Sequence, residues 1–240
     1  MTRHTNKLPH ILHQEKLDEA KDKIQELTGL HPTNEKLLKG IRTLNIPPRI
    51  KDHMRSMLTG KIKCGPFWEK VPEHNERVFC SFCRKLNNIN IVETEEHMWL
   101  ECQNSGQERV WNLTERTWRK STDREWPIIT LGLIRGAAAL AFEEDFNKDS
   151  ERLRILIIMT VWAIWKSKLK NSINDQDVTP NETTQLLKDL ITDLIRRSWN
   201  ETRFMDDDRK AIRQRKIRQL WAEDRLTKFD PKAGPTVNFT

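Results

Sequence analysis

The sequence predicts a mainly α-helical protein, a helical array that ends in a C-terminal helical bundle. Apolar residues recur at intervals of three and four along several segments, which is the period of one helical face. Only 8 of the 240 residues are glycine and 32% are charged, a composition that suits exposed helices better than strands and tight hairpins. A third observation is a set of cysteines and a histidine near the middle of the chain, which indicates a zinc knuckle embedded among the helices.

The N-terminal elements follow from periodicity. Residues 1–13 lack a period and are expected to be loose. Residues 14–28 are predicted to form a helix, because one face carries Leu17, Ala20, Ile24 and Leu27. Gly29 follows where a C-terminal cap would sit. Residues 1–30 are therefore predicted to be an N-terminal helical arm.

Two short helices are predicted next. Pro32 and Thr33 open the first, and Pro47 and Pro48 stop it before an amphipathic stretch over 50–58. A connecting loop is expected over residues 61–77, which contain Gly65, Pro66 and Pro72.

The middle of the chain offers another helix start. Ser105 followed by Glu108 is a capping-box pattern, and the helix it predicts would place Trp111 and Trp118 in the core. A stretch of small and apolar residues from 126 to 139 favours close helix packing. Acidic residues then mark a turn near 143–149, and a run such as Glu143 to Asp145 is more typical of a loop than of acid–base chemistry.

The longest apolar run, residues 155–165, lies in a helix predicted over about 151–169. It is far shorter than the roughly 20 residues that span a bilayer. Arg154 and Lys166 bound it, so we expect a buried helix, and we predict no membrane partner. Trp162 and Trp165 are expected in the core.

Thr179, Pro180 and Glu182 combine a capping box with proline at the first helical position. The helix that starts there is predicted to bury Leu186, Leu187, Leu190, Ile191, Leu194 and Ile195. A charged helix should follow over about 208–226. Residues 127–226 are thus predicted to form a helical bundle and 227–240 a flexible tail.

The cysteines suggest a metal centre. The N-terminus lacks the apolar core of a signal peptide, so the chain is expected to be intracellular. Cysteines in a reducing compartment are more often thiols or metal ligands than disulfides. Two residues separate Cys80 from Cys83, thirteen separate Cys83 from His97, and four separate His97 from Cys102. Three thiolates and an imidazole suit tetrahedral zinc and leave no open position for water, which predicts a structural zinc knuckle embedded in the helical array.

Two alternatives remain open at this site. In the first alternative no metal is bound. Cys80 and Cys83 would then be buried thiols, and His97 would be a surface histidine. In the second the two cysteines would be redox-active, but such a site needs a βαβ context that the flanking residues do not supply. Cys64 lies outside the pattern and is expected to be an ordinary, at least partly buried thiol.

A series of motifs resembles a known family. IRTLNIPPRIKDHM, GPFWEKVPEHNERVFCSFC, ETEEHMWLEC, RVWNLTERTW and WPIITLGLIRG follow one another in this order. The series is similar to the zinc-binding region that lies after the polymerase, and often after a ribonuclease H domain, in reverse transcriptases of non-LTR (LINE-like) retrotransposons, particularly fungal ones. Residues 31–126 would be that region. The resemblance implies Cys80, Cys83, His97 and Cys102 as zinc ligands, RNA or an RNA–DNA intermediate as partner, association with a reverse transcriptase, and a nuclear location.

The chain departs from the family in two ways. Its spacer between Cys83 and His97 is longer and contains LNNINIV, which we expect to be a loop or short hairpin. Polymerase and ribonuclease H activity need magnesium-binding carboxylates placed on strands, and neither strand pattern is found. The chain is therefore predicted not to be an enzyme, and it resembles a detached terminal piece of a polyprotein whose catalytic domains are absent here.

Charge points to a polyanionic partner. The chain carries a formal net charge of +7 and has a pI near 9.3. A first basic set precedes the cysteines and comprises Arg49, Lys51, Arg55, Lys61, Lys63 and Lys70. A second basic set lies on the charged helix and comprises Arg209, Lys210, Arg213 and Lys216, with Ile212, Ile217, Leu220 and Trp221 expected to anchor the opposite side.

Phosphate contact by these sets is one interpretation, and solvated helix faces are the other. Trp68, Phe79 and Phe82 would stack on unpaired bases or belong to the core. The sequence thus predicts a non-catalytic, zinc-stabilised nucleic-acid-binding protein. The alternative is a structural or protein-interaction remnant of a retroelement that does not bind nucleic acid.

Overall fold

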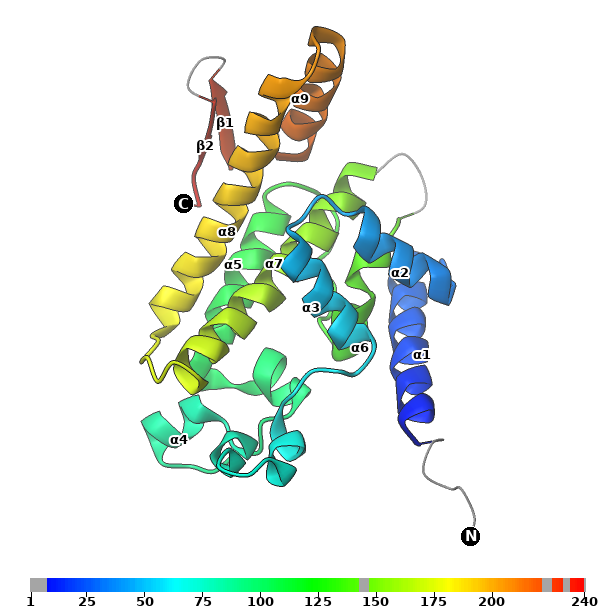
Figure 1. Cartoon of the computed structure of the whole chain (residues 1–240). Coiled ribbons are helices and arrows are strands. Elements are labelled where there is room, and N and C mark those ends of the chain that lie inside the picture. The colour runs from blue at the N-terminus through cyan, green and yellow to red at the C-terminus, as the bar shows by residue number, and fades with distance from the viewer. Residues whose placement is uncertain (1–7, 143–146, 222–225, 231–233, 240) are drawn as a thin grey trace.

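The expected helices are present in the computed structural model, which describes residues 8–142, 147–221, 226–230 and 234–239 (Figure 1). The α-helices are α1 (Leu8–Thr28), α2 (Asn34–Thr43), α3 (Pro48–Leu58), α4 (Ser81–Asn87), α5 (Gln107–Arg119), α6 (Leu131–Gly136), α7 (Asn147–Ser172), α8 (Pro180–Glu201) and α9 (Asp207–Trp221). The short helical turns are η1 (Gly65–Lys70), η2 (Asn75–Val78), η3 (His97–Glu101), η4 (Gln103–Ser105), η5 (Ala137–Ala139) and η6 (Thr202–Phe204). Two strands follow, β1 (Thr227–Asp230) and β2 (Gly234–Val237).

Helix α7 is the centre of the array. It packs against α5 and α8 along its length and against α3, α4 and α9 elsewhere. Residues 155–164 are buried on every side, as expected for a helix that is apolar all round. No helix in the described part of the chain combines the length and the apolar character needed to cross a membrane. Trp111, Trp118 and Trp162 are buried and Trp165 packs against the same core, as predicted.

Helices α1 and α6 lie in close contact, as the small residues of the 126–139 stretch predict. A Cβ added at Gly132 would lie 2.8 Å from the backbone oxygen of Glu19, and one added at Gly136 would lie 2.6 Å from Cδ1 of Ile24. Only glycine allows this approach of the two helices. Arg135, between the two glycines, is buried and forms ion pairs with Glu19 and with Glu95.

The N-terminal helix is longer than expected. Helix α1 begins at Leu8 rather than near residue 14, with Pro9 in its first turn, where its missing N–H is tolerated. Residues 1–7 lie outside the described residues. Gly29 ends the helix with φ 75° and donates its amide to the carbonyl of Gln25 at 2.8 Å, as predicted for the cap.

Two predicted capping boxes have different outcomes. At α8, Thr179 Oγ1 accepts from the Glu182 amide at 3.2 Å, while Glu182 Oε2 accepts from the Thr179 amide at 2.7 Å. The box predicted at Ser105 and Glu108 is wrong. The residue before α5 is Gly106 at φ 79°, and the Ser105 hydroxyl instead donates to the Cys102 carbonyl at 3.0 Å.

The C-terminal residues correct two expectations. The segment expected to be a flexible tail contains the antiparallel hairpin of β1 and β2, which packs on α8. The ring of Phe229 lies 5.1 Å from that of Trp199, so an aromatic contact holds the hairpin. Helix α9 buries Ile217 and Trp221, but Ile212, expected as an anchor, is 59% exposed. The turn expected near residues 143–149 lies outside the described residues at 143–146, and residues 147–149 belong to α7 instead. Residues 222–225, just before the predicted end of α9 near residue 226, also lie outside the described residues.

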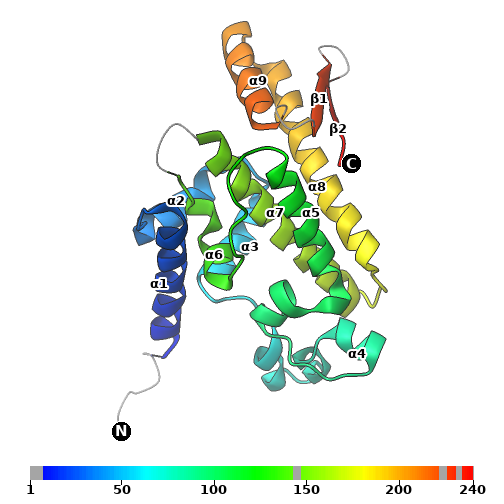
Figure 2. The same ribbon diagram turned by 180° about the vertical axis from the view of Figure 1, so that it is seen from behind.

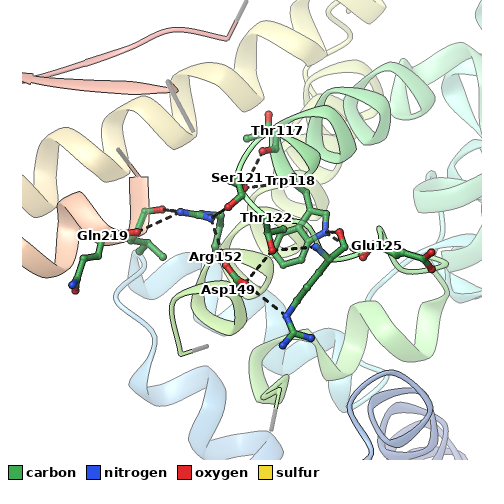
Figure 3. A network of polar contacts seen from close by, with 10 residues as sticks. Thr117, Trp118, Ser121, Thr122, Glu125, Asp149, Arg152 and Gln219 are labelled. Atoms are coloured by element: carbon green, nitrogen blue, oxygen red, sulfur yellow. Dashed lines mark hydrogen bonds and ion pairs between the residues drawn. The ribbon is translucent and has the colours of Figure 1, made fainter. Parts of the chain in front are cut away.

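A buried arginine joins three helices at the end of the bundle nearest α9 (Figure 3). Arg152 of α7 is fully buried. Its Nε donates to the Leu220 carbonyl of α9 at 2.8 Å, and its Nη1 donates to the Ser121 carbonyl after α5 at 2.8 Å. Asp149 lies 3.6 Å from the same guanidinium. The side chain thus satisfies backbone carbonyls that helix ends leave without partners.

Candidate metal centre

Two of the predicted ligands, Cys80 and Cys83, lie at the start of α4. Helix α4 is at the end of the molecule opposite α9 (Figure 1). The chain enters through a β-bridge between Phe79 and Val92, and the Cys80 amide donates to the Ile91 carbonyl at 2.7 Å. Cys80 is the residue before α4 and Cys83 lies in its first turn. The long spacer is therefore the rest of helix α4, a left-handed turn at Asn88 and a return segment that reaches the bridge at Val92. This agrees with the loop or short hairpin expected from LNNINIV, except that its first two residues end α4. We call residues 79–92 the metal hairpin.

The other two residues are joined by a π-helical turn, η3. The Cys102 amide donates to the carbonyl of His97, five residues earlier, at 2.8 Å. Thr94 Oγ1 accepts from the His97 amide at 2.9 Å and holds the start of the turn. An α-helix would place residues five apart on different sides, and the wider π turn brings both side chains to one side.

The four side chains converge on one point. Their donor atoms all lie within 4.8 Å of one another, and all four residues are buried. The Sγ atoms of Cys80 and Cys102 are 3.6 Å apart, those of Cys83 and Cys102 are 3.8 Å apart, and Cys83 Sγ lies 3.4 Å from His97 Nε2. Bonds of about 2.3 Å to a tetrahedral zinc ion would place sulfur atoms about 3.8 Å apart. The cluster thus fits one metal ion, and all four cysteines of the chain are free of disulfides.

The electrostatics of the cluster also favour a cation. The hydrogen bond with Cys102 and then burial raise the pKa of the Cys80 thiol, and burial raises the pKa of Cys83. The same hydrogen bond lowers the pKa of the Cys102 thiol. Without a cation only part of the cluster ionises, because adjacent thiolates repel one another in a buried site. A divalent ion would stabilise all three thiolates.

Side chains around the cluster orient it. Asn104 Nδ2 donates to Cys83 Sγ at 3.5 Å. Lys168 of α7, which is buried, donates to Ser81 Oγ at 3.3 Å and forms an ion pair with buried Glu93, so α7 holds both sides of the hairpin. Phe82 packs with Cys80, Cys83 and Cys102 in a small apolar cluster. It belongs to the core and is not exposed for base stacking.

The two basic sets lie far apart. The first begins on α3 with Arg49, Lys51 and Arg55 and continues through Lys61 and Lys63 to Lys70 at the end of η1, near the metal centre. The second lies on α9, at the opposite end of the molecule in both views (Figures 1 and 2). All ten side chains are exposed or half-buried. Two of them form ion pairs with a residue three positions earlier, Arg55 with Asp52 on α3 and Arg209 with Asp206, the residue before α9.

Several residues of the site have no signal in the sequence. Lys168 lies 66 residues beyond the last predicted ligand, Cys102, and contacts the hairpin only because α7 passes beside α4. Asn104 follows Cys102 closely, but its role depends on the turn η4.

Cys64 is half-buried and apart from the cluster, as expected. Burial raises the pKa of Cys64 to about 12, so it is a neutral thiol.

Comparison of the chain with protein-family models, with curated proteins and with solved structures finds no match.

Proposed function

We propose that Cys80, Cys83, His97 and Cys102 hold one structural zinc ion. The observation that carries this proposal is the set of sulfur and nitrogen separations, which match the edges of a zinc tetrahedron. Three thiolates and an imidazole favour zinc among the metals common in cells. Four protein ligands leave no position for a reacting water, so the ion would hold the shape of the α4 hairpin and contribute folding free energy.

We further propose that the zinc-braced protein binds nucleic acid, RNA or an RNA–DNA intermediate, without catalysing a reaction. The net charge of +7 and the exposed cations of the first basic set beside the metal centre support this. The link to reverse transcription, to a reverse transcriptase partner and to the nucleus depends on the motif resemblance alone. We expect no magnesium-dependent cleavage of an RNA–DNA hybrid by the purified chain.

Metal content tests the first part. Protein purified without chelator is expected to carry one zinc ion per chain by mass spectrometry under non-denaturing conditions. Cys83→Ala should lose the ion, whereas the matched control Cys64→Ala should keep it, because Cys64 lies outside the cluster. A chain that carries no metal after purification without chelator, or a Cys83→Ala chain that keeps its ion, would contradict the proposal.

Salt dependence tests the second part. Binding of zinc-loaded protein to a single-stranded oligonucleotide should weaken steeply between about 50 and 200 mM salt, because each phosphate contact releases counterions. Replacing Lys61 and Lys63 by glutamine should reduce the slope. The same change at Lys188 and Arg196 of α8, outside both basic sets, is the control and should leave the slope nearly unchanged.

Protein interaction is the second candidate function. The spacer of the metal hairpin exposes four apolar side chains, Leu86, Ile89, Ile91 and Val92, which are between 38% and 63% exposed. Exposed apolar groups gathered on one small element favour a protein contact. Zinc-loaded protein that shows no nucleic-acid binding at low salt would favour this candidate.

A further inference from the structure

A cavity of about 230 Å³ lies between the metal hairpin and the C-terminal half of α7. Its apolar walls include the rings of Trp68, Phe79 and Trp165, and Cys64 and Met98 also line it. None of these residues is a ligand in the metal cluster. The cavity is smaller than the about 300 Å³ at which sites for drug-sized molecules begin, so one planar ring system fits better than a large ligand.

The aromatic walls are held in place by neighbouring groups. Trp68 Nε1 donates to the Lys63 carbonyl at 3.2 Å, and the guanidinium of Arg77 lies 5.0 Å from the Trp68 ring centre. The Trp165 ring stacks on His53 with centres 5.0 Å apart and an interplanar angle of 29°. A ligand ring would therefore meet side chains whose rotamers are already fixed, which lowers the entropy cost of binding.

The charges that line the cavity are mainly positive. Lys63, Arg77, Arg84 and Lys168 oppose Glu76 and Glu93, so the net charge is 4 − 2 = +2. Glu93 is held by Lys168 in a buried ion pair, which leaves Lys63, Arg77 and Arg84 against Glu76 alone. Among the described residues, the buried Nε of Arg77 has no hydrogen-bond acceptor, and its nearest carboxylate, Glu76, lies 3.7 Å away.

From these observations we infer that the cavity receives one unpaired base of a nucleic-acid strand, with the adjoining phosphates on Lys63, Arg77 and Arg84. Aromatic rings accept the face of any base, and arginine and lysine pair with phosphate. A base pair within a duplex cannot enter so small a space, so the site would select single strands or unpaired ends. The inference rests on the proposed nucleic-acid binding and assigns it a specific site.

Two strands with the same number of phosphates test the inference. One is a ten-nucleotide oligouridine, and the other carries abasic nucleotides throughout. Zinc-loaded protein should bind the first about tenfold more tightly than the second, which is within the range for base–aromatic stacking. Trp68→Leu should bring this ratio close to one without changing the salt slope. Trp126→Leu, a half-buried tryptophan outside the cavity, should retain the ratio.

Arg77→Met keeps the apolar stem and removes the charge. It should weaken the binding of both strands severalfold and lower the salt slope by about one, whereas Arg116→Met on the exposed side of α5 should do neither. Photo-crosslinking with 4-thiouridine should place the link on Trp68, Phe79 or Trp165. Zinc content and melting temperature of each variant check that the hairpin is intact.

The outcomes separate the two proposals. Salt-dependent binding that is equal for the normal and the abasic strand would overturn the base pocket and leave nucleic-acid binding in place. Crosslinks confined to α9 would also overturn the pocket. No binding of either strand at low salt by the zinc-loaded protein would overturn both.

Discussion

Cys83 Sγ lies 3.4 Å from His97 Nε2, although thirteen residues separate the two positions. The contact joins the first turn of α4 to the π turn η3. Within the described part of the chain, the apolar cluster around the cysteines consists of Cys80, Phe82, Cys83 and Cys102, with Val178 beside it, and is separate from the main core. We therefore expect the hairpin to depend on the proposed metal ion more than the bundle does.

Metal removal is accordingly expected to act locally. Chelation should expose the hairpin to trypsin at Arg84 and Lys85, while the far-ultraviolet circular dichroism of the bundle stays largely unchanged. The measurement is limited proteolysis with mass spectrometry, with and without chelator. Protection of both sites after complete metal loss would contradict a structural role for the ion.

Arg152→Met is predicted to destabilise the protein by about 3 kcal/mol or more, because it removes a fully buried guanidinium and leaves the half-buried carbonyls of Ser121 and Leu220 without this donor. Chemical denaturation measures the free energy of unfolding. Arg119→Met, on the exposed side of α5, is the matched control and should change stability by less than about 0.5 kcal/mol. Equal effects of the two substitutions would show that the buried guanidinium is dispensable.

The contact between α1 and α6 yields a steric prediction. Gly136→Ala should cost about 1 to 3 kcal/mol, because the added methyl group meets Ile24 at 2.6 Å and the backbone of Ala20 at 3.0 Å. Gly29→Ala is the comparison, since there the methyl group has open space and only the positive φ of 75° is strained. Thermal unfolding followed by circular dichroism would distinguish the two. A smaller loss at Gly136 than at Gly29 would mean that α6 can move away from α1.

His53 should make stability depend on pH. It lies among Trp99, Trp162 and Trp165, and burial lowers its pKa from 6.5 to about 4, with Glu95 acting weakly in the opposite direction. The unfolded chain then binds a proton between pH 6.5 and 4 that the native protein does not bind. Stability from this group is complete above pH 6.5 and is lost as the pH falls, by roughly 3 kcal/mol at pH 4.

His53→Phe keeps the ring and removes the titration, so its unfolding free energy should fall less than that of the original protein between pH 6.5 and 4. The difference between the two chains isolates His53 from the metal ligands, which respond to acid in both. Parallel pH profiles for the two chains would refute the assignment. Among the described residues His53 Nε2 has no hydrogen-bond partner, so the substitution removes no buried hydrogen bond at that atom.

The order of helices and the four positions of the cysteine and histidine cluster were predictable from the sequence because both depend on local spacing. Periodicity placed most of the helix bodies, and Thr179 with Glu182 defined a helix start from interactions within four residues. The cysteine and histidine spacing defined the cluster, since ligand chemistry limits which residue types can share an ion. The start of α1 and the hairpin after α9 were missed, because no local pattern marks them.

Tertiary structure alone decided what surrounds the site. Gly106, in the left-handed region, precedes α5 in place of the capping box predicted from Ser105 and Glu108. The ring of Trp199 holds Phe229 in a hairpin, where composition predicts a flexible tail. Three further features join segments that are distant in the chain. They are the contact of Lys168 with the hairpin, the hydrogen bonds of Arg152 to two other helix ends, and the cavity beside Trp68. Local sequence determines ligands and helices because their energies are set within a few residues; contacts between distant segments depend on how the helices pack, which no short pattern encodes.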